Sequence, residues 1–250
     1  IRGLTATSER GSCEGLDAAV RFEGPWPLTT PAGQLLSAAR LDLGLALTDG
    51  VVEFQLRPQG VLEVASAQWS FAGGTIHTRG AVALDGDSQG LVLDIAGVDL
   101  SELLALVDLE GLSGTGIVAG RIPVSRRGGT VAIENGRLEA SPEGGWIRYA
   151  GQTAGAAAAS GDQNLAFAFA ALENFHFDGL VATIDGDVSE EVSVSIHLSG
   201  ANPDTMEGHP FEFNLRVESR LVDLLRNATA VHQMPARIEE RIREMWEASR

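Results

Sequence analysis

Few residues of this 250-residue chain have the spacing that a catalytic or cofactor-binding site requires. Gly114, Gly116 and Ala119 match the GxGxxA form of the dinucleotide fingerprint, which needs a strand before it and a helix after it. Here a helical pattern precedes the glycines and a strand pattern follows them. We therefore interpret the two glycines as a bend that eases the chain between strands.

Metal-binding and hydrolytic patterns are equally weak. Two Asp-Gly-Asp segments, at residues 85–87 and 185–187, resemble the start of a calcium loop. Neither continues with the further oxygen ligands and closing glutamate that such a loop needs, and Asp-Gly is the expected pair of a hairpin turn. The five histidines form no i, i+4 pair, and no serine lies in a GxSxG elbow. We predict that both Asp-Gly-Asp segments form turns, and that the chain binds no metal or cofactor and is not an enzyme. A hydrolase on a β scaffold would need a catalytic pair, which we do not find.

Composition excludes further classes of function. The chain carries 34 acidic and 18 basic residues, a formal charge of −16, which disfavours nucleic acid and adsorption to anionic lipid. Cys13 is the one cysteine, so no internal disulfide can form. No segment has the length and apolarity of a membrane-spanning helix. Because the first residue is Ile1, within a strand-like pattern, we expect the chain to be a fragment of a longer protein.

The elements that must position any site are strands. Apolar and polar residues alternate with a period of two through much of the chain, which predicts strands with one apolar and one polar face. The sequence therefore predicts a mainly β protein with an amphipathic antiparallel sheet. The candidates for its functional face are the apolar members of these strands: Leu41, Leu43, Leu45, Leu47, Val52, Phe54, Leu56, Leu91, Leu93, Ile95, Val192, Val194, Ile196, Leu198, Phe211, Phe213, Leu215 and Val217.

Turn and helix signals divide the chain. Asp49-Gly50 and Asn135-Gly136 predict hairpin turns, and the leucines at 41, 43, 45 and 47 are expected on one strand. A helical period predicts a helix near residues 100–109, capped by Asp99 or Ser101. A second helix is expected near 164–175, after an Ala/Gly-rich flexible stretch at 151–163. Residues 1–40 are poorly patterned and would continue a sheet from upstream, 41–220 would form the main β unit, and 221–250 a C-terminal helical segment.

Two uses of the apolar face remain open on pattern alone. The helices near 100–109 and 164–175 could cover it, which would make a structural or interaction module. Alternatively, the face could stay partly uncovered as a groove for acyl chains. Pattern alone favours the first, because most such faces form a core.

Five segments of the sequence shift this balance toward a groove. The segments LEGLSGTGIVAGRIPV (109–124) and VAIENGRLE (131–139), with ANPD (201–204), GHPFEFNLRV (208–217) and LVDLLR (221–226), resemble the YdbH family. This family belongs to the AsmA-like group and is also labelled a dicarboxylate-transport domain. The resemblance covers roughly residues 41–250.

The resemblance implies an elongated, curved antiparallel sheet with an apolar groove. It implies the C-terminal part of a bridge across the periplasm of a Gram-negative bacterium, anchored in the inner membrane, that carries phospholipids without an enzymatic step. The implied partners are phospholipid acyl chains and a small outer-membrane lipoprotein, which would add a strand at the C-terminal sheet edge. The dicarboxylate label finds no support, because a dianion requires a cluster of basic residues.

Overall fold

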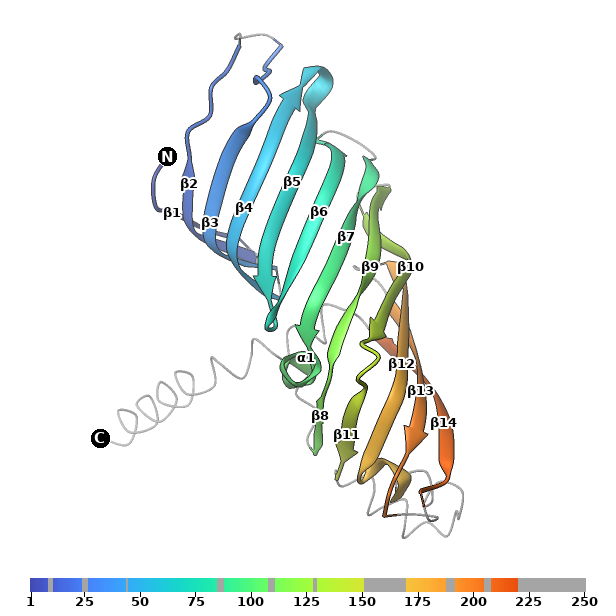
Figure 1. Ribbon diagram of the computed structural model, residues 1–250. Coiled ribbons are helices and arrows are strands. Elements are labelled where there is room, and N and C mark those ends of the chain that lie inside the picture. The colour runs from blue at the N-terminus through green and yellow to red at the C-terminus, as the bar shows by residue number, and fades with distance from the viewer. Residues whose placement is uncertain are drawn as a thin grey trace, which may run out of the picture.

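A single open antiparallel sheet contains every strand of the described chain (Figure 1). The structure is a computed structural model that describes residues 1–219 apart from residues 9–10, 24–26, 44, 85–87, 108–110, 128–129, 151–169, 188–191 and 205–207. The strands are β1 (Leu4–Ser8), β2 (Gly11–Ala18), β3 (Gln34–Asp42), β4 (Ala46–Arg57), β5 (Val61–Phe71), β6 (Gly74–Ala83), β7 (Ser88–Asp99), β8 (Leu112–Thr115), β9 (Ile117–Arg127), β10 (Thr130–Ala140), β11 (Gly145–Tyr149), β12 (Phe175–Asp187), β13 (Val192–Ala201) and β14 (Pro210–Ser219).

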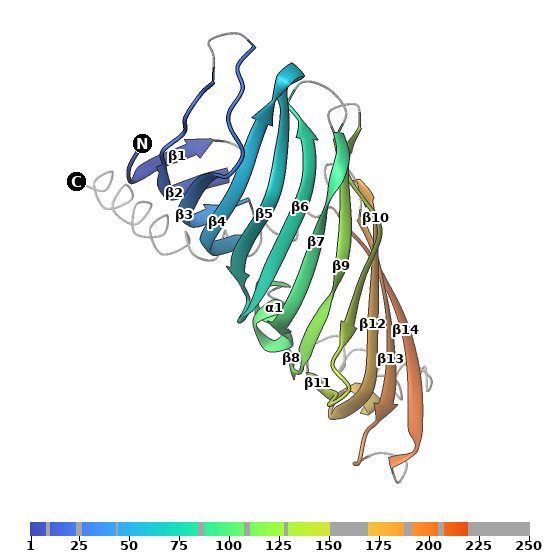
Figure 2. The ribbon, with the colours of Figure 1, turned by 45° about the horizontal axis from the view of Figure 1, so that its top comes forward.

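The strands lie side by side like rungs, and the sheet curves and twists along its long axis (Figures 1 and 2). Strands β1 to β7 pair in sequence order, and β9 and β10 follow β7. Strand β12 then pairs with both β10 and β11 along one edge and with β13 along the other, and β14 follows β13. This confirms the expected elongated, curved, mainly β fold. The poorly patterned residues 1–40 supply β1, β2 and most of β3 to the same sheet.

The predictions of hairpin turns at Asp49-Gly50 and Asn135-Gly136 are wrong. Asp49-Gly50 lies inside β4 and Asn135-Gly136 inside β10, and the strand register shifts at each site. Asp49 and Asn135 have φ values of 53° and 54°. A β-bulge uses the same left-handed backbone as a type I′ turn, so the dipeptide alone does not distinguish them.

Three other expectations also change. The leucines at 41–47 do not share one strand, because β3 ends at Asp42 and β4 begins at Ala46. The second Asp-Gly-Asp segment, 185–187, forms the end of β12 instead of a turn. Of the helix expected near 164–175, residues 170–172 are helical, but Phe175 already begins β12. The expected turn at 85–87, the stretch 151–163 and the C-terminal segment 221–250 lie outside the described residues.

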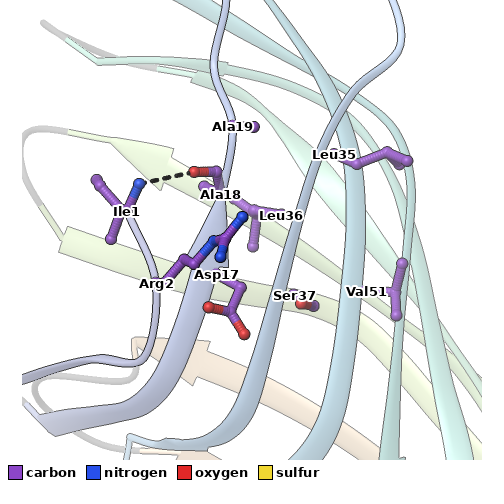
Figure 3. A pocket seen from close by; sticks show the side chains of 9 residues that line it. All are labelled: Ile1, Arg2, Asp17, Ala18, Ala19, Leu35, Leu36, Ser37 and Val51. Carbon is purple, nitrogen blue, oxygen red and sulfur yellow. Dashed lines mark hydrogen bonds between the residues drawn. The ribbon is translucent and has the colours of Figure 1, made fainter.

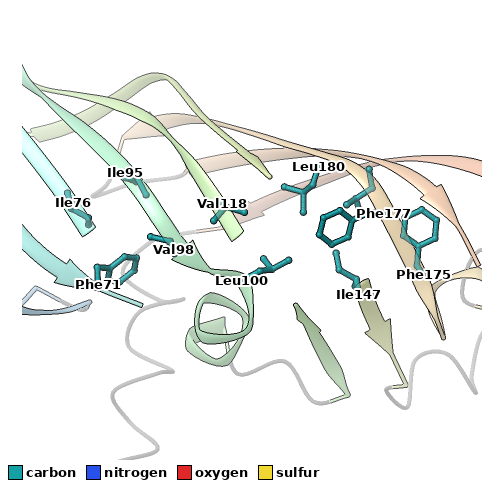
Figure 4. Close-up of a cluster of buried hydrophobic side chains, with 11 residues drawn as sticks. Phe71, Ile76, Ile95, Val98, Leu100, Val118, Ile147, Phe175, Phe177 and Leu180 are labelled. Atoms are coloured by element: carbon teal, nitrogen blue, oxygen red, sulfur yellow. The ribbon is translucent and has the colours of Figure 1, made fainter. Parts of the chain in front are cut away.

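The helix expected near 100–109 is present as α1 (Leu100–Val107). Asp99 caps it, since its Oδ1 accepts hydrogen bonds from the backbone N of Ser101 at 2.7 Å and from Ser101 Oγ at 2.6 Å. Leu100 joins the main buried cluster, which also holds side chains of β5, β6, β7, β9, β11, β12 and β13 (Figure 4). The core therefore lies on one side of the sheet, where α1 packs against it.

A short 3₁₀ segment, η1 (Pro58–Gly60), joins β4 to β5. The GxGxxA segment is a bend, as predicted: Gly114 lies in β8, and Gly116, with φ 142°, separates β8 from β9. No helix follows it, so the geometry that a dinucleotide needs is absent at this segment.

Candidate functional site

The candidate site is one whole face of the sheet. Residues directly opposite each other on neighbouring strands point to the same side, so the register identifies which residues share a face. We call the side that carries the buried cluster and α1 the apolar face, and the other side the polar face.

Rows of apolar residues cross the apolar face perpendicular to the strands. The Trp69 row follows consecutive cross-strand pairs through Trp69, Ile76, Ile95, Gly120, Leu138, Ala182, Ile196 and Leu215. The Phe54 row follows Phe54, Val64, Gly80, Leu91, Val124, Ile133, Gly186 and Val192. Each row crosses eight strands without a charged residue, so the face offers a continuous apolar surface along the long axis of the sheet.

The structure brings most of the residues predicted from sequence to this face. Leu43 is the exception, since it lies in the turn after β3 with 58% of its surface exposed. Val217 pairs in register with Val194. The others lie on the face or pack against its cluster: Leu41, Leu45, Leu47, Val52, Phe54, Leu56, Leu91, Leu93, Ile95, Val192, Val194, Ile196, Leu198, Phe211, Phe213 and Leu215.

Several members of the face were not among the predicted site residues. They are Leu62, Val64, Trp69, Ile76, Val118, Ile122, Val124, Ile133, Leu138, Leu180, Ala182 and Ile184. The same alternation runs through their strands, so it would have found them. What the alternation could not supply is the register that aligns them into rows.

Two features cover part of the apolar face. Leu103, Leu104 and Leu106 of α1 pack against the buried cluster, as does Leu172 of the helical turn 170–172. Asn202, which is 1% exposed, holds that turn through hydrogen bonds from its Nδ2 to the carbonyl oxygens of Ala170 and Ala171. The side chains beneath this cover are almost completely buried, as Val98, Val118, Phe175 and Leu198 show.

The polar face carries a matching row of polar side chains. Behind the Trp69 row, consecutive pairs join Gln68, His77, Asp94, Arg121, Arg137, Thr183, Ser195 and Arg216. Arg121 Nε donates to Asp94 Oδ1 at 2.7 Å, and Arg137 forms an ion pair with Glu139. The hydrogen bond from Arg121 lowers the pKa of the Asp94 carboxyl below its ordinary value. These pairs keep the face charged and hydrated.

Hollows in the surface do not identify a small-molecule site. One at the N-terminal end is lined by residues that include Leu35, Ser37 and Val51, and Ile1 N closes it through a hydrogen bond to Ala18 O at 3.0 Å (Figure 3). Two others flank Arg137 and are lined chiefly by residues of the polar face. All three are shallow, and none holds a pair of side chains arranged for acid–base catalysis.

Within the part of the chain that the structure describes, no three His, Cys, Asp or Glu side chains gather closely enough to hold a metal ion. In the same residues, no helix has the length and apolarity to cross a membrane.

A family model matches residues 1–243, and its description is YdbH-like, intermembrane phospholipid transport protein YdbH. The chain belongs to the YdbH-like family. The resemblance found in the sequence is thus confirmed, and the match also includes residues 1–40, where sequence reasoning found little signal. Neither a search of curated proteins nor a search of solved structures finds a match.

The YdbH-like description names a protein that transports phospholipids between membranes. An apolar surface that runs along the length of a sheet has the chemistry to contact acyl chains.

Proposed function

We propose that this chain carries phospholipids along its apolar face, between the inner and outer membranes of a Gram-negative cell, without an enzymatic step. The observation that carries the proposal is the set of apolar rows that cross eight strands without a charged residue. The YdbH-like description supports it.

The mechanism is passive movement of acyl chains along the rows, with head groups in solvent. Each methylene removed from water contributes about 0.8 kcal/mol, so a lipid with two chains is retained without a specific pocket. No position along a row is charged or forms a closed pocket, so the lipid can slide from one position to the next. No covalent step and no cofactor is required, and the periplasm is the compartment that such a bridge would cross.

Lipid bound to the purified protein tests this function. Phospholipid extracted from the protein and quantified by mass spectrometry should fall several-fold in Leu93→Glu, because the carboxylate would sit on the apolar face. Val92→Glu is the matched control, since Val92 is the adjacent residue of β7 and points to the polar face. If the purified protein carries no phospholipid, or if both variants lose it equally, the proposal is wrong.

The second candidate function, a structural module with a fully covered face, is favoured by the packing of α1 and turn 170–172 on the cluster. The same extraction decides between the two, because a fully covered face would yield no bound lipid.

The proposed protein partner is a small outer-membrane lipoprotein that adds a strand to β14. Among the described residues, β14 pairs with β13 alone and stands at the C-terminal end of the sheet. An open edge offers backbone groups to an added strand. A photoreactive residue at Glu212 of β14 should crosslink to a lipoprotein in cells, whereas one at Ser195 of β13, an interior strand, should not. Equal crosslinking at both positions would contradict strand addition.

A further inference from the structure

The apolar face is divided into two bands by what lies over it. The covered band comprises Val98, Leu100, Val118, Ile147, Phe175, Phe177, Leu180 and Leu198, each less than 9% exposed. These side chains belong to the cluster against which the leucines of α1 and Leu172 pack. A side chain that already contacts protein on all sides has no surface left for a lipid.

The open band lies farther along the same strands, beyond α1 and the turn 170–172, although Val64, Ile133 and Val192 of the Phe54 row beside it are also buried. It comprises Leu91, Leu93, Ile122, Val124, Ile184 and Val194, all half-buried. Leu91 lies opposite Val124, Leu93 opposite Ile122, and Ile184 opposite Val194. Half-buried apolar side chains that neither α1 nor the turn 170–172 covers are the surface that gains most from contact with an acyl chain.

One positive charge lies at the margin of the open band. On β9, Ile122, Val124 and Arg126 alternate onto the apolar face, and Arg126 pairs with Val131 of β10 and Ser88 of β7. The Arg126 side chain is half-buried, and no ion pair in the described part of the chain involves it. Arg121 on the same strand differs, because it points to the polar face and pairs with Asp94.

We propose that the open band and Arg126 form one phospholipid-binding site, in which acyl chains lie on the band and the phosphate binds the Arg126 guanidinium. The proposal rests on the proposed function and specifies where on the face the lipid lies. A guanidinium matches a phosphate group with two parallel hydrogen bonds, and it stands beside apolar side chains with little hydration to lose.

Three matched pairs of positions test the open band. A photoreactive residue at Leu93, Ile122 or Val194 should form lipid adducts several-fold more often than one at Val98, Val118 or Leu198, which share their strands and face. A phosphatidylethanolamine with a diazirine in its acyl chain, used with the unaltered protein, gives the same map without substitution in the core. Adducts at the covered positions in equal yield would overturn the division but leave the proposed function standing. No adducts anywhere would overturn both.

Arg126→Gln tests the phosphate contact. Binding of a phosphatidylethanolamine should fall several-fold, whereas binding of a diacylglycerol with the same acyl chains should not change, because it has no phosphate. Arg121→Gln, on the polar face of the same strand, should change neither. Equal loss of both lipids in Arg126→Gln, or no loss of the phospholipid, would overturn the role of Arg126.

Discussion

Asp49 and Asn135 each precede a glycine, and each has a positive φ, 53° and 54° respectively. Both pairs were predicted to form hairpin turns, but each forms a bulge inside a strand. The choice depends on whether the chain continues along the same neighbour, which is a property of the sheet and not of the dipeptide. The bulge at Asp49 lets residues on both sides of it keep their apolar members on one face: Leu47 before it and Val52 after it.

Gly50 has a second role beside that bulge. A Cβ at this position would overlap the ring of Trp69, the first member of the Trp69 row. We expect Gly50→Ala to lower the free energy of unfolding by about 1–3 kcal/mol, as overpacking usually does. Urea unfolding measures the change. If the clash is the cause, the cost should shrink in a Trp69→Leu background, and an unchanged cost would contradict this explanation.

At the scale of elements, α1 shows what local periodicity can predict. Its helical period and its cap at Asp99 were both readable from the sequence. The long alternating strands β7, β13 and β14 were equally readable, together with the residues of their apolar faces. The sequence did not show which strands are neighbours. A period of two assigns each residue to one face of the sheet, but it contains no information on strand pairing. Strand β12, which pairs with β10 and β11 on one edge, illustrates this limit.

The cap of α1 should make its stability depend on pH. Hydrogen bonds from Ser101 Oγ and from the Ser101 backbone lower the pKa of Asp99 in the folded state. A depressed carboxyl pKa stabilises the fold above the unfolded pKa of about 3.9, and this contribution is lost as pH falls through the folded pKa. The stability difference between the unaltered chain and Asp99→Asn, which keeps a capping side chain that does not titrate, should therefore be larger at neutral pH than in acid. Urea midpoints across that range measure it, and a difference independent of pH would refute the assignment.

At the scale of the molecule, the sheet separates two surfaces along eight neighbouring strands. The Trp69 row and the polar row behind it run through the same eight strands, β5, β6, β7, β9, β10, β12, β13 and β14. Seven interstrand spacings of about 4.8 Å make each row roughly 34 Å long. A pocket of fixed depth stops adding contacts once an acyl chain fills it. A row of this length continues past the end of an acyl chain, so each added methylene still finds apolar surface. This difference gives the proposed function a signature in the dependence of affinity on chain length.

Affinity for soluble lysophospholipids should increase steadily with acyl-chain length. Each added methylene should tighten binding by up to about fourfold, since it removes apolar surface from water against a row that continues beyond it. Fluorescence titration with lysophosphatidylcholines of increasing length measures this, and Trp69 lies in the row as an intrinsic probe. Leu93→Glu should flatten the dependence and Val92→Glu should preserve it. A plateau at short chain length in the unaltered protein would indicate a closed pocket, and it would contradict transport along an open face.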